Sequence, residues 1–157
     1  MTTTAPEVQT VQVYQLFIKA SPDAVWDAIT RPEFTERYFY GMRIETTPER
    51  RRVFARDDDG DWGDDRIIQF DPPRRLVHGW RAKWSAELRA EPESRVTWEL
   101  EPREDGTTLL TLVHDQLERS PKTAASVARP GWTRVLSGLK TLLETGTPLF
   151  EYGAGDR

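Results

Sequence analysis

Two histidines are the residues of this chain best suited to proton transfer or to anchoring a polar ligand group. His78 lies in the segment Leu76–Trp84 and His114 lies in Thr107–Gln116, and both segments alternate apolar and polar side chains. Imidazole titrates near neutral pH, and an apolar pocket normally needs a small number of polar groups to orient its ligand. Each histidine is therefore interpreted either as a hydrogen-bonded core residue or as a polar anchor.

Other chemical motifs are absent from the sequence. There is no cysteine, which excludes disulfides, thiolate nucleophiles and cysteine-ligated metals. The acidic run at 57–61 lacks the later glutamate of a calcium loop and is interpreted as a solvated turn. No nucleophile elbow, phosphate loop or dinucleotide fingerprint occurs. We therefore predict no metal, no cofactor and no assigned catalytic residue.

Length and composition favour one globular domain over residues 1–157, with a loose tail at 1–8 and a C-terminal tail at 147–157. Hydrophobic residues make up 37% and charged residues 31%, which argues against disorder. The net charge of −4 leaves no basic surplus for nucleic acid. No run of about 18 apolar residues suggests a membrane span, and the polar N-terminus does not look like a signal peptide. A cytoplasmic location is the expectation.

The histidines must be positioned by a helix and a sheet. Between Pro130 and Glu144 apolar residues recur at steps of three and four, which predicts one amphipathic helix. Pro130 suits its first position, and Gly146 suits its left-handed end. Such a stripe needs a broad apolar cover; it consists of Trp132, Val135, Leu136, Leu139, Leu142 and Leu143.

A seven-strand antiparallel sheet is predicted to provide that cover. A first strand spans 11–19, and two short helices follow, the first capped by Ser21 and the second carrying Phe34. An irregular segment after Arg119 could carry a turn of helix into the main helix. Short turns make the remaining strands an antiparallel meander, and they span Met42–Thr46, Arg52–Arg56, Arg66–Phe70, Leu76–Trp84, Arg95–Glu101 and Thr107–Gln116.

The alternation of side chains along these strands predicts an aromatic interior. Short-turn pairing places Trp80, Trp98 and Leu112 in about one row, with a slip of two residues left open. In that register the two histidines lie more than about 10 Å apart, too far to share a metal ion. Periodicity does not separate a packed core from a lined cavity. The candidate ligand-binding residues are Tyr38, Phe39, Phe70, His78, Trp80, Trp84, Trp98, Leu112, His114, Trp132, Leu136 and Leu139.

The short basic runs at 50–52 and 74–75 are interpreted as solvated positions beside turns, not as a binding patch. Asp64 and Asp65 begin a strand, and the sequence does not decide which of them points inward. Trp62 is unusual in its charged surroundings.

Several stretches carry a family resemblance: Ile18–Thr30, Pro32-Glu33, Phe70–Val77, Ser94–Leu100, Thr111–His114 and Gly131-Trp132. Together they resemble the START-like (SRPBCC) superfamily, and more narrowly its bacterial branch named after activators of the heat-shock chaperone ATPase. The resemblance implies an α+β helix-grip fold, in which a curved antiparallel sheet wraps a long C-terminal helix around a hydrophobic cavity. Where many members of this branch carry a Trp-Phe pair, this chain has Tyr38-Phe39-Tyr40, which puts extra hydroxyls near the expected cavity mouth.

The resemblance leaves three functions open, because one fold supports many activities. Relatives bind lipids, sterols, polyketides or plant hormones, so a non-catalytic binder of a small apolar or aromatic ligand is favoured. A polyketide cyclase or hydrolase would use His78 or His114 as a base with a tyrosine as the acid. A chaperone cofactor or stress-response module, with a chaperone or a second copy as its partner, would need an exposed apolar patch outside the cavity.

Overall fold

The structure is a computed structural model that describes residues 10–54, 61–128 and 130–152. The predicted loose tail at 1–8 lies outside these residues, as do most of the predicted acidic turn and the last five residues of the chain. No helix in the described part combines the length and apolar character needed to cross a membrane.

Seven antiparallel strands form one sheet in the order β1-β7-β6-β5-β4-β3-β2. Strands β2 to β7 pair in chain order, and β1 joins the far side of β7. The predicted seven-strand meander is therefore confirmed. The strands span Gln12–Ile18 (β1), Arg43–Thr46 (β2), Arg50–Phe54 (β3), Asp61–Asp71 (β4), Arg75–Trp80 (β5), Ser94–Pro102 (β6) and Thr108–Asp115 (β7).

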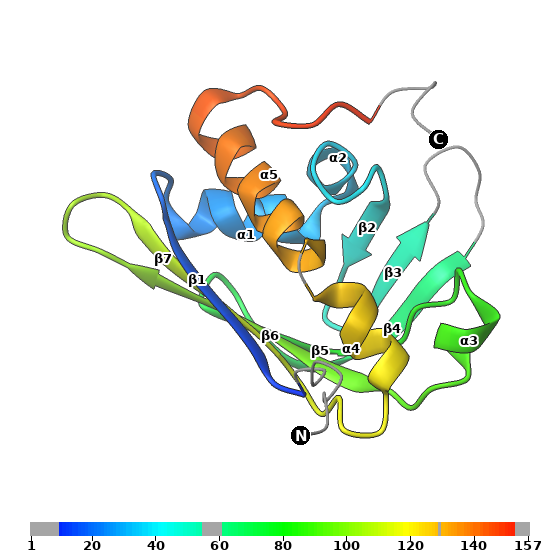
Figure 1. Cartoon of the computed structure of the whole chain (residues 1–157). Helices are drawn as coiled ribbons and strands as arrows, with labels where there is room; N and C mark the ends of the chain where they lie inside the picture. The colour runs from blue at the N-terminus through cyan, green and yellow to red at the C-terminus, as the bar shows by residue number, and fades with distance from the viewer. Residues whose placement is uncertain (1–9, 55–60, 129, 153–157) are drawn as a thin grey trace, which may run out of the picture.

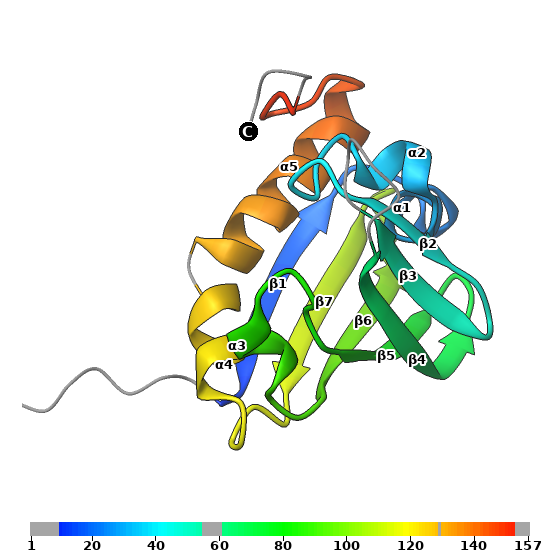
Figure 2. The same cartoon turned by 90° about the vertical axis from the view of Figure 1, so that its right-hand side faces the viewer.

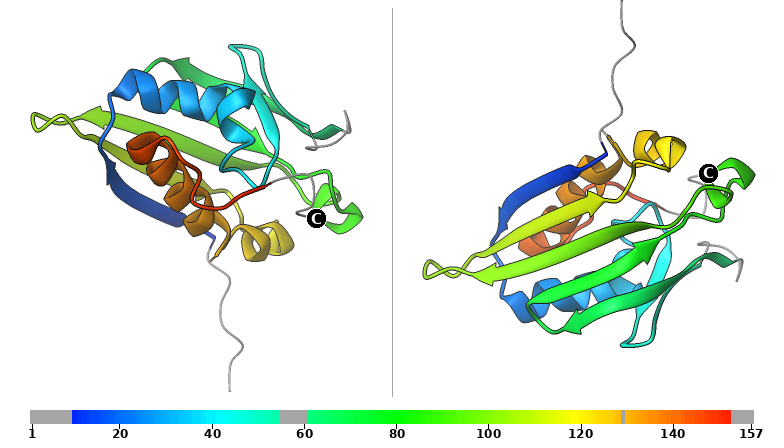
Figure 3. Two further views of the ribbon diagram at one scale, coloured as in Figure 1. Left: turned by 90° about the horizontal axis from the view of Figure 1, so that it is seen from above. Right: turned by 90° about the horizontal axis from the view of Figure 1, so that it is seen from below.

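The helices gather on the concave side of this sheet. In Figure 1, α5 runs across the hollow with α1 and α2 beside it, and the sheet curves beneath them. Seen from below, the strands lie in front of the helices (Figure 3). This arrangement confirms the helix-grip fold. The helices span Pro22–Thr30 (α1), Pro32–Thr35 (α2), Ala86–Arg89 (α3), Pro121–Val127 (α4) and Gly131–Thr145 (α5).

Helix α5 follows its predicted pattern closely. Its apolar stripe is buried, and Gly146 ends it with a φ of 78°, the left-handed conformation that glycine adopts without strain. Pro130 is the N-cap, so the helix begins one residue later than predicted. A Cβ at Gly138 would lie 3.1 Å from the Cβ of Tyr38, so the helix approaches the segment after α2 closely at this glycine.

The predicted alignment of Trp98 with Leu112 is confirmed, but Trp80 lies four residues away from that row. Trp98 pairs with Leu76 on one side and Leu112 on the other, while Trp80 pairs with Ser94. The reason is the connection between β5 and β6, which the sequence pattern treated as a longer strand and a short turn. Strand β5 ends at Trp80, and the connection contains the helix α3, which was not predicted.

This register also corrects the expected spacing of the histidines. His78 pairs with Val96, and Val96 pairs with His114. The two histidines therefore share one row of the sheet, two strands apart, without the predicted offset along the strands.

The interpretation of the basic run at 50–52 is wrong at its central residue. Arg50 and Arg52 are exposed, but Arg51 is only 1% exposed because it shares the inward face of β3 with Val53. The position of Asp65 is also settled, since Asp65 is buried on the adjacent strand. Two ionisable side chains, those of Arg51 and Asp65, are therefore buried on neighbouring strands.

Candidate functional site

His78 is held by two hydrogen bonds inside the sheet. The indole N–H of Trp98 donates to its Nε2 at 3.0 Å, and its Nδ1 lies 2.7 Å from the carbonyl oxygen of Gly79. An indole N–H only donates and a carbonyl only accepts, so the ring must be neutral with its proton on Nδ1.

His114 is held in the opposite tautomer. The indole N–H of Trp132 on α5 donates to its Nδ1 at 3.1 Å, which leaves the proton on Nε2. That nitrogen lies 2.8 Å from the Oγ of Ser94, whose hydroxyl can in turn donate to the carbonyl of Trp80 at 3.3 Å. The contact between Trp132 and His114 ties the helix to the sheet.

Burial keeps both rings uncharged. It lowers the pKa of His114 to about 3, and it lowers the pKa of His78 well below its ordinary value, with the positive charge of Arg51 as the second cause. Because every ring nitrogen already has a protein partner, neither histidine offers a nitrogen to a guest. Among the described residues, no three His, Asp or Glu side chains gather as a metal site.

A cavity of about 600 Å³ opens beside this closed region. It lies between the start of α5, the end of α4, the segment 39–42 and the β4–β5 side of the sheet. Figure 2 shows α4 and α5 following one another along one side of the sheet. Aromatic side chains dominate its wall, and Trp84 lies edge-on to Trp80, 6.5 Å between centroids. The lining residues are Phe39, Tyr40, Met42, Trp62, Trp80, Trp84, Ser126, Val127, Gly131, Trp132 and Val135.

The structure divides the candidate ligand-binding residues into two groups. Phe39, Trp80, Trp84 and Trp132 line the cavity. The other eight do not appear in its wall. Seven of these are packed in the core, and the eighth, Phe70, is partly buried against Trp26: the eight are Tyr38, Phe70, His78, Trp98, Leu112, His114, Leu136 and Leu139.

The tyrosine hydroxyls follow the same division. Tyr38 donates its hydroxyl to the carbonyl of Ala28 at 2.7 Å in the core, and burial raises its pKa. Tyr40 lies at the cavity and donates to the carbonyl of Gly131 at 3.2 Å. The hydroxyl expected near the mouth is therefore that of Tyr40.

Seven lining residues were not among the candidates. Trp62 was assigned to a charged turn, but β4 begins at Asp61 and carries its ring to the cavity. Val135 lies on the predicted helical stripe, so its inward face was visible in the sequence. The missed residues are Tyr40, Met42, Trp62, Ser126, Val127, Gly131 and Val135.

A buried arginine and a buried aspartate lie at the inner end of this region. The Nη1 of Arg51 donates to the carbonyl of Ile29 at 3.1 Å and to the hydroxyl of Thr46 at 2.6 Å. Burial lowers the pKa of Arg51 to about 10, so the guanidinium stays charged at neutral pH.

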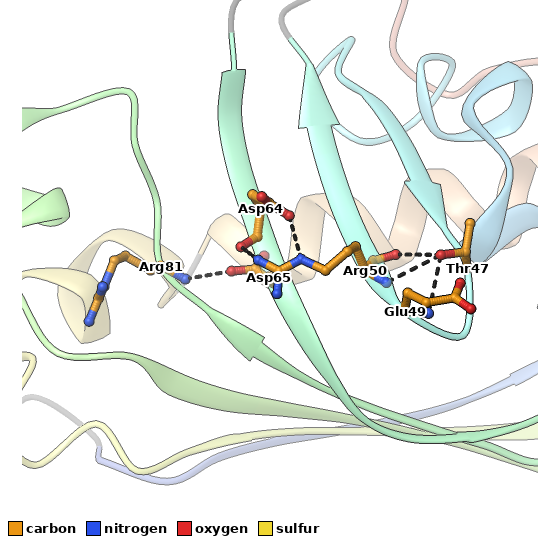
Figure 4. A network of polar contacts seen from close by, with 6 residues as sticks. All are labelled: Thr47, Glu49, Arg50, Asp64, Asp65 and Arg81. Atoms are coloured by element: carbon orange, nitrogen blue, oxygen red, sulfur yellow. Dashed lines mark hydrogen bonds and ion pairs between the residues drawn. The ribbon is translucent and has the colours of Figure 1, made fainter.

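Asp65 accepts the backbone N–H of Arg81 at 3.0 Å, and burial raises the pKa of Asp65 to about 7. Its neighbour Asp64 instead binds Arg50 at 2.7 Å near the surface, as Figure 4 shows.

Sequence comparison identifies the family to which this architecture belongs. Residues 19–144 match the sequence profile of the family described as "Activator of Hsp90 ATPase homolog 1-like protein". The chain belongs to this family. The match confirms the resemblance to the bacterial branch of the START-like superfamily. No curated protein matches the chain by sequence.

Solved structures share the fold of this family member. Protein MLL2253 from Mesorhizobium loti has a TM-score of 0.67 at 24% identity, over 85% of this chain and 96% of that one. DynU16, from the dynemicin biosynthetic locus, has a TM-score of 0.67 at 25% identity over 89% of this chain, which spans 49% of DynU16. The Aha1 dimer from Colwellia psychrerythraea has a TM-score of 0.65 at 18% identity, over 88% and 98%.

The neutral state of His114 generates a pH-dependence prediction. Its pKa is about 3 in the folded protein and about 6.5 in an unfolded chain, so the unfolded state binds more protons between these values. The stability that this group supplies is complete above about pH 6.5 and is lost as the pH falls toward 3. His114→Asn removes the titrating group while its amide oxygen can still accept from Trp132. We expect a shallower fall in the free energy of unfolding between pH 6.5 and 4.

Urea denaturation at several pH values measures this effect. At pH 7 the variant should be less stable by roughly 1–3 kcal/mol, because the buried hydrogen bond between His114 and Ser94 is lost. If the free energy of unfolding of His114→Asn falls with pH in parallel with that of the unaltered protein, His114 is not the neutral, buried group described above.

Proposed function

We propose that this family member binds a small, largely apolar or aromatic molecule in the cavity beside α5. The observation that carries the proposal is the lining, in which four tryptophans, a phenylalanine and a tyrosine surround about 600 Å³ of space. Concave, mostly apolar pockets of this size are typical of small-molecule sites. The protein from the dynemicin locus, similar in structure, adds support from a biosynthetic setting.

Partly exposed rings at the cavity strengthen this proposal. Trp84 is 41% exposed, and Trp62 lies 6.1 Å from it between ring centroids. Apolar surface gains about 25 cal/mol per Å² when it leaves water, so covering on the order of 200 Å² of such rings supplies about 5 kcal/mol. That gain is reduced by the entropic cost of association. A ligand with a flat, apolar body therefore suits the wall.

The same geometry gives no support to a histidine-based enzyme in this cavity. A general base must reach the proton that it removes, directly or through one water. His78 and His114 both use their ring nitrogens within the protein, and the Tyr38 hydroxyl is bonded to Ala28. A binding role thus agrees better with the side chains present.

The cytoplasmic location and the extent of a single domain over residues 1–157 stay predictions.

A second candidate function, docking of another protein chain, is favoured by the outer face of β1. Val13 and Phe17 are 59% and 53% exposed on this strand, which pairs only with β7 among the described strands and so lies at a sheet edge. Exposed apolar edge strands are common sites of chain association. A structurally similar Aha1 is described as a dimer, so the partner we propose is a second copy.

Ligand binding is tested by removing one ring from the wall. Trp84→Ala should weaken binding of the neutral fluorophore anthracene-2-carboxamide about tenfold, because a large aromatic contact is lost. Fluorescence titration measures the dissociation constant. Phe17→Ala is the matched control, because it removes a comparably exposed ring from the edge strand β1, outside the cavity wall. This variant should leave the dissociation constant unchanged. Absence of binding to the unaltered protein, or equal losses in both variants, would contradict the proposal.

Self-association is tested by placing charge on the β1 face. Val13→Lys should raise the dimer dissociation constant at least tenfold, because the new lysines of the two copies would lie close together where the β1 strands meet. Sedimentation experiments over a concentration series measure this constant. Ile68→Lys, at a position 43% exposed on β4, is the control and should leave association intact. A protein that remains monomeric throughout the concentration series would remove this second candidate.

A further inference from the structure

The cavity continues inward into a small polar recess. Phe39, Met42 and the three rings of Trp62, Trp80 and Trp84 line both spaces. The recess adds Arg51 and Asp65 to its wall and has a volume of about 10 Å³. A space of that size holds about one water molecule, and hence one oxygen of a larger group. The apolar cavity therefore ends at two buried ionisable side chains.

Two buried donors, carried by two residues that line this recess, have no hydrogen-bond partner among the described residues. They are the Nη2 of Arg51 and the indole Nε1 of Trp80. A buried donor that is left unsatisfied costs about 1–3 kcal/mol, and more when it carries charge. Both groups can only donate, so the group that would satisfy them must be a hydrogen-bond acceptor.

Arg51 also makes no hydrogen bond to a carboxylate among the described residues. Its hydrogen bonds go to a carbonyl and a hydroxyl, and its guanidinium lies 5.8 Å from the ring centre of Trp98. Asp65 is its cross-strand partner, but no salt bridge joins the two side chains within the described residues, and Asp65 instead accepts from the backbone of Arg81. Burial raises the pKa of Asp65 to about 7 against the opposing effect of Arg51, so near neutral pH Asp65 compensates the charge of Arg51 only in part. A buried charge is stable only when it is paired. An anionic acceptor therefore complements Arg51 and its free Nη2 better than a neutral acceptor does.

We propose that the ligand of this site carries a carboxylate at one end of its apolar aromatic body, and that one oxygen of this carboxylate enters the recess and accepts hydrogen bonds from Arg51 and Trp80. The inference rests on the proposed binding function and narrows its ligand class. A neutral carbonyl would satisfy the two donors but not the charge, and a cationic group would be repelled by Arg51. The apolar rings would bind the body of the ligand, while the recess would favour ligands whose terminal group is negatively charged.

A pair of matched probes tests the proposal. Anthracene-2-carboxylate and anthracene-2-carboxamide share one aromatic body and differ in charge at one end. The unaltered protein should bind the carboxylate at least about tenfold more tightly, as expected for a hydrogen bond to a charged group. Arg51→Met should abolish this preference, because it removes the charge along with one donor and so weakens carboxylate binding much more than carboxamide binding. Arg50→Met, which removes an exposed positive charge on the same strand, should keep the preference.

A second variant and a spectroscopic signal protect the test against misfolding of Arg51→Met. Asp65→Asn removes the competing carboxylate and should retain or increase the preference for the carboxylate probe. In the unaltered protein, the guanidinium NMR signals of Arg51 should shift with the carboxylate and much less with the carboxamide.

Equal affinity for the two probes would overturn the carboxylate inference while leaving the binding function intact. A preference lost equally in Arg50→Met and Arg51→Met would overturn it as well, because the effect would then be general surface electrostatics. If neither probe binds, both the binding function and the inference fail.

Discussion

The interior of this protein depends on two indole N–H groups that donate to two neutral imidazoles. Trp98 and His78 join neighbouring strands, and Trp132 and His114 join α5 to the sheet. Each bond satisfies a buried donor whose loss would cost about 1–3 kcal/mol, so the rings are fixed in one orientation. The helix can settle on the sheet only where Trp132 reaches His114.

This constraint determines where open space remains. Trp132 also lies 5.4 Å from Trp80 and 5.7 Å from Trp98, between ring centroids, so it separates the packed histidine region from the cavity. On the packed side both imidazoles are fully buried and hydrogen-bonded to tryptophans. On the other side, β5 ends at Trp80 and α5 has only begun, so the aromatic rings line a cavity.

Arg51 adds an electrostatic constraint to this packing. Its charge contributes to the lowered pKa of His78, and the desolvated guanidinium has its own pKa lowered. One cation is therefore maintained in the interior while the imidazoles remain neutral. A carboxylate guest would compensate that cation, which joins the aromatic wall and the charged recess into one site.

Much of the fold could be predicted from the sequence because periodicity reports which side chains share a face. The stripe on α5 and the alternating strands predicted an amphipathic helix covered by an antiparallel sheet, and the family resemblance implied the helix-grip arrangement. The inward positions of His78, Trp98 and His114 followed from the alternation along the strands. The register of β5 against β6 could not be predicted, because it depends on the length of their connection and on the four-residue helix α3 within it.

The site was harder to predict than the fold. Trp98 and Trp80 lie on the same inward set, yet only Trp80 borders open space, and that difference depends on volume, not on pattern. Arg51 was missed because a run of three arginines suggests solvation. The signal present was its alternation with Val53, which places both side chains on one face of β3.

The indole N–H signals of the six tryptophans provide the most direct test of this account. They should be recorded in a ¹H–¹⁵N NMR titration of the protein with anthracene-2-carboxamide. The account predicts that the signals of Trp62, Trp80 and Trp84 shift on binding, while those of Trp26 and Trp98 stay in place. Shifts centred on Trp26 or Trp98, or no shift in any of the six, would contradict the assignment of the cavity.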